Sequence, residues 1–219
     1  MSAADAWLEI ACPLCGATAP TVFHHGARGA FLRCSTCALV FLDPAEWPSL
    51  DAEIARYELH ENDDDDPRYQ EFLSRLADPL IARTQPGDRG LDFGSGESDA
   101  LAQLLTRAGR PTSAYDAAFR PDDALLRQRY DFVACSEVLE HAHEPRSVLD
   151  QLGELIAPDG VIGIMTGMYD AVPSFADWWY IRDDTHVCFY SRAAMEWIAR
   201  AYSWSAEFPA LNVTVFTHR

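Results

Sequence analysis

Two features that are common in membrane and secreted proteins are missing from this sequence of 219 residues. There is no long charge-free apolar run, which argues against a membrane-spanning helix. Residues 1–6 carry neither a basic group nor an apolar block, which argues against a secretory signal peptide. No internal repeat or low-complexity segment is evident. We therefore expect a soluble, cytoplasmic protein without a membrane partner.

Positive charge is scarce in this chain. The 17 basic residues stand against 34 acidic ones, which gives a formal net charge of −17. A chain with this balance is repelled by phosphate backbones, so a nucleic-acid partner is not expected. The four aspartates at 63–66 are interpreted as a solvated loop, and a metal site is the alternative interpretation.

Cysteine is sparse too, and six cysteines without a secretory signal argue against a disulfide framework. Four of them form two Cys-x-x-Cys pairs, Cys12 with Cys15 and Cys34 with Cys37. Each pair can direct two thiolates at one ion, and the spacing between the pairs suits a four-cysteine zinc site. Four thiolates leave no open coordination position, so we expect structural zinc, contributing on the order of 10 kcal/mol to folding.

Alternatives to this zinc site stay open. The four cysteines could lie reduced in a core, and His24 or His25 could replace a ligand, although two histidines in a solvent-facing loop are the simpler interpretation. Cys135 and Cys188 stand apart in apolar surroundings and are interpreted as ordinary buried thiols.

The order of apolar segments predicts an α/β fold, with a doubly wound, mostly parallel sheet and a small N-terminal zinc-binding module. The predicted strands occupy 90–93, 112–115, 130–136, 161–165, 204–208 and 213–217. The predicted helices occupy 50–60, 69–83, 100–105, 146–157 and 191–202, with a Pro-Asp-Gly turn at 158–160. The expected domains are a zinc-ribbon-like module at 1–45, a helical connector at 46–85 and an α/β domain at 86–219.

The segment 90–98 is the most informative part of the chain, because a strand there turns through Gly94 and Gly96 into a helix. Glycines at alternate positions allow a tight turn and a close approach to a ligand. Asp116 follows at the end of the second predicted strand, where a carboxylate can accept both hydroxyls of a ribose. An ordinary turn aspartate is the alternative. Dinucleotide enzymes share this geometry, but the carboxylate of Asp92 favours a cationic ligand over a pyrophosphate.

Together these segments resemble those of class I S-adenosylmethionine-dependent methyltransferases. Residues 91–96 resemble the family's first motif, and residues 130–141 resemble its fourth-strand segment. Residues 158–165 resemble the turn and fifth strand that follow. The likeness covers roughly 85–219, in the expected order. Two more segments, 53–62 and 178–190, resemble an uncharacterised bacterial subgroup that carries an N-terminal four-cysteine module.

The resemblance implies a methyltransferase domain that binds S-adenosylmethionine. The glycine turn would curve around the methionine half of the cofactor, Asp92 would lie near its amino group, and Asp116 would hold the ribose. The backbone of the residue that ends the fourth strand would face the methyl-transfer centre. The residues assigned to the cofactor in this way are Asp92, Gly94, Ser95, Gly96, Asp116 and Ser136.

Two departures from the family pattern lead to predictions of their own. Ser98 stands where the motif usually has a third glycine, so helix and ligand are expected to pack differently. Residues 117–129 leave room for only one crossover between the second and fourth strands. We therefore predict that the usual third strand is missing or reduced, with Phe119 and Leu125 helping to form the adenine pocket.

Two histidines are candidates for a catalytic base. His141 follows the fourth strand, His186 lies in a loop after the fifth, and neutral imidazole can take a proton from a hydroxyl or amine. A structural role for each is the equal alternative. The aromatic cluster 178–180 either lines a substrate pocket or packs beneath a long connection.

Three functions are consistent with these features. The leading hypothesis is methyl transfer from S-adenosylmethionine to a small-molecule acceptor. The second is methylation of RNA, since some ribosomal-RNA methyltransferases carry a zinc module, but the acidity of the chain argues against it. The third is a cofactor-binding regulator whose zinc module contacts a protein partner.

Overall fold

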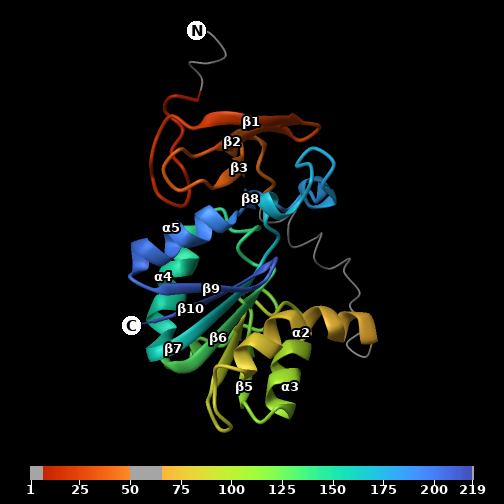
Figure 1. Ribbon diagram of the computed structural model, residues 1–219, viewed down its shortest axis with the longest axis vertical. Coiled ribbons are helices and arrows are strands. Elements are labelled where there is room, and N and C mark those ends of the chain that lie inside the picture. Colours follow the sequence, from red (N-terminus) through yellow and green to blue (C-terminus); the bar gives the residue numbers. More distant parts are fainter. Residues whose placement is uncertain (1–6, 50–65, 219) are drawn as a thin grey trace.

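A computed structural model describes residues 7–49 and 66–218 (Figure 1). The predicted helix at 50–60 and the similar segment at 53–62 lie outside the described residues, as does most of the aspartate run. The described chain contains two sheets. A small N-terminal sheet sits at one end of a larger one, which carries helices on both faces (Figure 1).

The larger sheet has six strands, and five of them run in the same direction. Its order is β5 (Thr112–Tyr115), β4 (Gly90–Phe93), β6 (Tyr130–Ser136), β7 (Ile156–Met165), β10 (Val213–Thr217) and β9 (Ser205–Ala210). The first four strands run parallel, whereas β10 is antiparallel to both of its neighbours. This is the mostly parallel, doubly wound sheet that the sequence predicts.

Within the described residues, four helices cover the larger sheet, and their bounds are α2 (Pro67–Ile81), α3 (Ala100–Arg107), α4 (Pro145–Leu155) and α5 (Arg192–Tyr202). Side-chain caps fix two of the starts. The carboxylate of Asp66 accepts from the amide of Arg68 at the start of α2, and the hydroxyl of Ser191 accepts from the amide of Ala194 in α5.

The alternation of side chains along the central strands builds two separate cores. In β6, Phe132 and Ala134 pack against α2 and α3, whereas Val133 and Cys135 belong to the core that contains residues of α4 and α5. Successive residues of a strand point to opposite faces, so an almost wholly apolar strand fills both cores at once. Cys135 and Cys188 are fully buried, as the sequence predicts.

The connection from α4 to β7 differs from its prediction. The helix ends at Leu155 rather than at 157, and β7 begins at Ile156. Tyr130 pairs with Ile156 and Phe132 pairs with Val161, so residues 157–160 bulge out of the ladder between these two pairs. The Pro-Asp-Gly sequence still turns, with Asp159 at φ +64°, but the turn lies inside a strand instead of before it.

The prediction of a missing third strand is confirmed. Residues 117–129 are described throughout and contain only an isolated bridge between Asp116 and Arg120 and a 3-10 turn, Leu125–Arg127. β5 is therefore an edge of the six-stranded sheet.

The N-terminal sheet combines strands from distant parts of the chain. Its order is β1 (Thr21–Gly26), β2 (Gly29–Arg33), β3 (Val40–Leu42) and β8 (Cys188–Phe189). Leu14 and Leu32 share one continuous core with Leu91 and Tyr190. His24 and His25 lie on β1 and not in the loop that was expected, because this segment pairs with β2. No helix within 7–49 or 66–218 is both long and apolar enough to cross a bilayer.

Candidate functional site

The glycine turn after β4 adopts a backbone conformation that glycine accommodates best. Gly94 has φ +76° and Gly96 has φ +67°. The amides of Gly94 and Ser95 both donate to the carbonyl oxygen of Tyr115, at 2.8 and 3.0 Å, which ties the turn to the end of β5. A Cβ on Gly94 would overlap the side chain of Val138, whereas the corresponding position on Gly96 has no atom within 4 Å. The turn thus packs tightly on one side and stays open at Gly96.

Asp116 braces this turn from the end of β5. One carboxylate oxygen accepts from the Gly96 amide at 3.0 Å, and the other accepts from the amides of Ala118 and Phe119 at 2.8 and 3.0 Å. This is the turn aspartate that the sequence left open as an alternative. A carboxylate has about four acceptor positions, so three backbone bonds leave room for a ribose hydroxyl. The assignment of Asp116 to the ribose stays a prediction.

Asp92 is a carboxyl group almost excluded from water, with 3% of its surface exposed. Burial is the largest cause that raises the pKa of Asp92 to about 7; the negative charges of Asp99 and Asp116 act in the same direction, and a hydrogen bond from the Ala102 amide acts against it. A buried carboxylate without a cation beside it is costly. The position therefore suits a positively charged ligand group.

The four predicted cysteines converge. Their sulfur atoms lie within 4.8 Å of one another, with Sγ of Cys12 at 3.5 Å from Cys37 and Sγ of Cys15 at 3.4 Å from Cys34. The hydrogen bond from Cys37 lowers the pKa of Cys12 to about 6. Neither His24 nor His25 belongs to this group. The cluster can hold a metal ion, and a four-sulfur donor set is typical of structural zinc.

A buried polar cluster lies beyond the end of β6, and its centre is Glu140, which is fully buried. Its carboxylate accepts from the hydroxyls of Tyr180 and Thr166, the second at 2.9 Å. The Tyr180 hydroxyl also lies 3.2 Å from Glu137. Burial and the neighbouring Glu140 raise the pKa of Glu137 well above its ordinary value.

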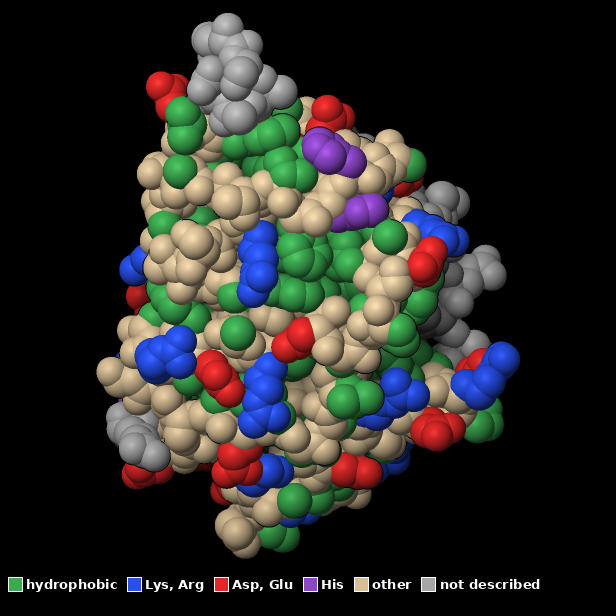
Figure 2. All heavy atoms as spheres, turned by 45° about the horizontal axis from the view of Figure 1, so that its top comes forward, with side chains coloured by type: hydrophobic (Ala, Val, Ile, Leu, Met, Phe, Trp, Pro, Cys, Tyr) green, Lys and Arg blue, Asp and Glu red, His purple; other side chains and the backbone are tan. Residues whose placement is uncertain are grey.

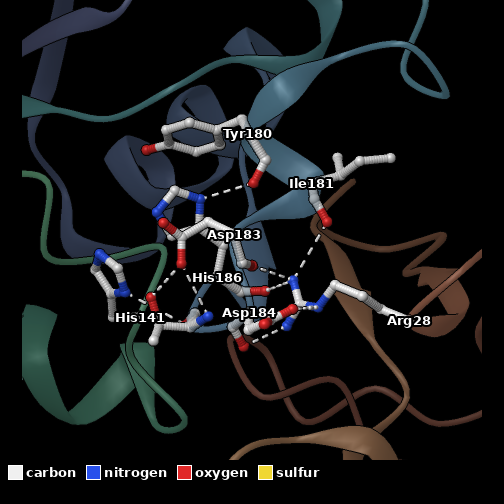
Figure 3. Close-up of polar contacts among 8 residues, drawn as sticks. Arg28, His141, Tyr180, Ile181, Asp183, Asp184 and His186 are labelled. Atoms are coloured by element: carbon white, nitrogen blue, oxygen red, sulfur yellow. Dashed lines mark hydrogen bonds and ion pairs between the residues drawn. The ribbon is translucent and has the colours of Figure 1, made fainter. Parts of the chain in front are cut away.

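The two histidines of the sequence prediction meet at this cluster (Figure 3). Their ring centroids are 4.6 Å apart, and Nδ1 of each ring faces a backbone carbonyl, that of Thr185 for His141 and that of Tyr180 for His186. Burial lowers the pKa of His141 to about 4, although the charge of Glu140 opposes this shift. Burial thus favours the neutral form of the His141 imidazole.

Sequence reasoning missed the carboxylates of this cluster. Glu137 and Glu140 both lie in the segment that carries the family resemblance, and a Glu-x-x-Glu-His sequence directly after a strand is the available signal. Tyr180 was predicted only as part of an aromatic cluster. Trp178 stacks on the Tyr180 ring at 4.6 Å, while Trp179 is 66% exposed, so the packing interpretation holds for two of these three aromatics.

Arg28, in the turn between β1 and β2, is a second residue that the sequence did not reveal. Its guanidinium reaches into the loop before β8 and donates to four backbone carbonyls (Figure 3). The acceptors are Ile181 at 3.4 Å, Asp183 at 2.5 Å, Asp184 at 2.7 Å and His186 at 2.7 Å. The N-terminal module thereby fixes the backbone of the loop that carries His186.

Replacing Arg28 with methionine is expected to lower the free energy of unfolding by about 3 kcal/mol, because several carbonyl oxygens lose their donor. Amide hydrogen exchange should accelerate in the loop at 181–187. Arg28→Lys should recover only part of the loss, since an ammonium cannot span four acceptors as a guanidinium does. Arg33→Met, at an exposed position of β2, is the matched control and should leave both measurements unchanged. If hydrogen exchange at 181–187 were unchanged in Arg28→Met, the loop would keep its structure without the hydrogen bonds from Arg28.

Curated relatives match part of the chain. The ubiquinone biosynthesis O-methyltransferase of Salmonella paratyphi A (strain ATCC 9150 / SARB42) is 31% identical over 104 residues, a match that spans 36% of this chain and 43% of that protein. The protein of the same name from Proteus mirabilis (strain HI4320) is 29% identical over 86 residues, which span 39% of this chain and 35% of the relative. The chain thus spans less than half the length of these relatives.

Solved structures share the fold. The 1,6-didemethyltoxoflavin-N1-methyltransferase of Burkholderia thailandensis superposes with a TM-score of 0.54 at 15% identity, covering 90% of this chain and 97% of that one. An O-methyltransferase family protein from the same organism gives 0.50 at 16% identity, over 76% and 62% of the two chains. A family model described as a methyltransferase domain matches residues 62–206, more than half of the chain. The chain therefore belongs to this methyltransferase domain family.

Proposed function

We propose that this protein transfers a methyl group from S-adenosylmethionine to a small-molecule acceptor. Membership of the methyltransferase domain family supports the reaction type. Both curated relatives are named O-methyltransferases of ubiquinone biosynthesis, and the methyltransferase structure from Burkholderia thailandensis contains 1,6-didemethyltoxoflavin together with S-adenosylhomocysteine. These names favour a small organic acceptor over a macromolecule.

The observation that carries the proposal is the open glycine turn next to a buried carboxylate. Gly96 leaves space that a ligand can approach, and Asp92 offers a negative charge in a dry environment. S-adenosylmethionine, when bound, supplies a methyl group on a cationic sulfonium. Asp92 would hold the amino group of its methionine half, and the Ser95 and Gly96 backbone would lie along it. Orientation alone can then supply much of the catalysis.

Other residues have proposed supporting roles. Asp116 would use its remaining acceptor capacity for the ribose, and the half-buried Ser136, at the end of β6, would present its backbone to the transfer centre. Phe119 and Leu125 would border the adenine, since the described residues 117–129 form no third strand. His141 and His186, which lie beyond the carboxyl end of β6, would orient the acceptor.

The N-terminal module has a proposed structural function. Its four convergent cysteines would hold one zinc ion that fixes the loops beside β2 and β3. Domain limits of 1–45, 46–85 and 86–219 remain our proposal for the sequence. The module and the α/β domain would act as one unit, because β8 completes the sheet of the module and Arg28 holds the loop before it.

Charge argues against RNA as the acceptor. The net charge is −17, and Figure 2 shows arginines interspersed with carboxylates, histidines and apolar side chains over one face of the molecule rather than gathered in a basic strip. RNA binding relies on such strips and on aromatic side chains among them. A small molecule therefore remains the preferred acceptor.

Calorimetric titration with S-adenosylmethionine tests the proposal. We expect one cofactor bound per chain, and transfer of a labelled methyl group when phenolic or amine acceptors are supplied. Gly94→Ala should abolish binding, because its Cβ would overlap Val138 and distort the turn. Gly87→Ala is a matched control, since Gly87 also has a positive φ of 96° but no neighbour within 4 Å.

The outcomes separate the candidate functions. Absence of cofactor binding in the wild-type protein would refute the enzyme proposal. Binding without transfer to any acceptor would favour the cofactor-binding regulator, whose partner would contact the N-terminal module. Salt-sensitive RNA binding at micromolar concentration would favour the RNA alternative.

A further inference from the structure

Three side chains beyond β6 have the composition of a metal site that is separate from the cysteines. One carboxylate oxygen of Glu140 and one ring nitrogen each of His141 and His186 lie within 4.8 Å of one another. Two imidazoles and a carboxylate are a ligand set found with divalent first-row transition ions, and they leave further coordination positions open.

The contacts around these residues are those that ligating side chains usually have. Nδ1 of His186 lies 2.8 Å from the carbonyl oxygen of Tyr180, and Nδ1 of His141 lies 3.3 Å from that of Thr185. A carbonyl oxygen only accepts, so each Nδ1 carries the proton and the lone pair of each ring is on Nε2. Metal-binding histidines typically donate their other ring N–H to such a carbonyl.

Glu140 is oriented in the same manner. The hydroxyls of Thr166 and Tyr180 donate to its two oxygens, which fixes the carboxylate and still leaves lone pairs available. Ligating carboxylates are commonly held by such hydrogen bonds. A buried carboxylate is costly unless it is paired with positive charge, and a divalent cation would supply that charge.

The backbone of the site is held from two sides. The carbonyl oxygen of Glu140 accepts from the amides of Val187 and Cys188, which joins the segment after β6 to the start of β8. Arg28 donates to the carbonyl of His186 at 2.7 Å. The two segments that carry the ligands are therefore fixed against each other without any contribution from a metal.

We propose that Glu140, His141 and His186 bind a divalent transition-metal ion at the carboxyl edge of β6. Three protein ligands leave positions for water or for an oxygen atom of a bound molecule. If the proposed methyl transfer is correct, and this step rests on it, the ion favours an acceptor that presents a hydroxyl oxygen. The two histidines then act as ligands rather than as bases.

Titration with Mn²⁺ tests this site in protein that carries one equivalent of zinc per chain, which the four thiolates take first, with binding followed by loss of the free-ion electron paramagnetic resonance signal. Mn²⁺ prefers oxygen and nitrogen ligands and competes poorly for thiolates, so the cysteines should not contribute. We expect one Mn²⁺ per chain, and at least a tenfold loss of affinity in Glu140→Gln and in His186→Gln. His25→Gln, on the exposed face of β1, should bind as the wild type does.

The wild-type protein provides a second measurement in case the variants do not fold. Mn²⁺ should selectively broaden the imidazole proton resonances of His141 and His186 and spare those of His25. No Mn²⁺ binding at millimolar concentration, or equal broadening of all histidines, would overturn the proposal. Neither measurement uses S-adenosylmethionine, so this site can fail while the proposed methyl transfer holds.

Discussion

Asp92→Asn is expected to lower the affinity for S-adenosylmethionine about 100-fold while making the cofactor-free protein more stable. The carboxylate would be lost as the partner of the cofactor's ammonium group, and breaking a buried charge pair costs several kcal/mol of binding free energy. Asparagine keeps the shape of the side chain and can still accept from the Ala102 amide. Asp123→Asn, at an exposed position after β5, is the matched control. Wild-type affinity in Asp92→Asn would contradict the assigned role.

The gain in stability should depend on pH in a defined direction. Burial raises the pKa of Asp92 from 3.8 to about 7, so the folded protein binds the proton more tightly than the unfolded chain does. In the wild-type protein, the tighter proton binding of Asp92 stabilises the folded state fully below pH 3.8. This stabilisation is lost as pH rises through 7, a change of about 4 kcal/mol in the free energy of unfolding. Urea unfolding measures the free energy of unfolding of both proteins at pH 5 and at pH 8. The difference in favour of Asp92→Asn should be about 2–3 kcal/mol larger at pH 8 than at pH 5. A gain that is equal at both would exclude titration of Asp92 as its cause.

Binding of the cofactor should also change the pKa of the buried Asp92 carboxylate. An ammonium group beside Asp92 favours the charged form and lowers its pKa, so binding should release a proton near neutral pH. Affinity should therefore rise as pH increases towards 7 and level off above it. Titrations in buffers of different ionisation enthalpy measure this release, and it should disappear in Asp92→Asn.

Much of the larger sheet was predictable because its signals are local. Strands β4, β5 and β6 are short segments bounded by turns, and the order of strands and helices follows from the chain. The absent third strand followed from connection length alone. The bulge at 157–160 was not predictable, because Pro-Asp-Gly indicates a turn whether or not the flanking residues pair with a neighbour. β8 has only two residues, too few to show any periodicity.

The features of the candidate site likewise fall into two groups, those that neighbouring residues in the sequence reveal and those that only the tertiary structure creates. The cysteine pairs and the glycine turn are recognisable from neighbours in the sequence, and the structure brings each together. Arg28, by contrast, reaches carbonyls more than 150 positions away, and Tyr180 reaches Glu140 across 40. Backbone carbonyls exist at every residue, so no sequence pattern marks the four that accept from Arg28. The contact belongs to the tertiary structure, in which β8 pairs with β3 and the loop before β8 lies against the N-terminal module.

Loss of the proposed zinc ion is expected to unfold the N-terminal sheet. Cys34→Ser should release the metal, because one of four thiolates is missing, and structural zinc contributes on the order of 10 kcal/mol to small modules. Cys34→His is the matched control, since three cysteines and one histidine also form a tetrahedral zinc site. Zinc content per chain and the thermal unfolding midpoint should fall in the serine variant and be largely retained in the histidine variant.

The effect of zinc loss should extend beyond the module. Cys12 and Cys34 share a core with Tyr190, β8 pairs only with β3 within the described residues, and Arg28 holds the loop of His186. Unfolding β1–β3 removes all of these restraints, so hydrogen exchange should accelerate at 181–186, whereas the amides of Val187 and Cys188 keep Glu140 as their acceptor and those of β4 and β6 stay protected. If the amides at 181–186 kept their protection after zinc removal, the α/β domain would hold the His186 loop unaided. In that case the module would serve a purpose other than fixing the site.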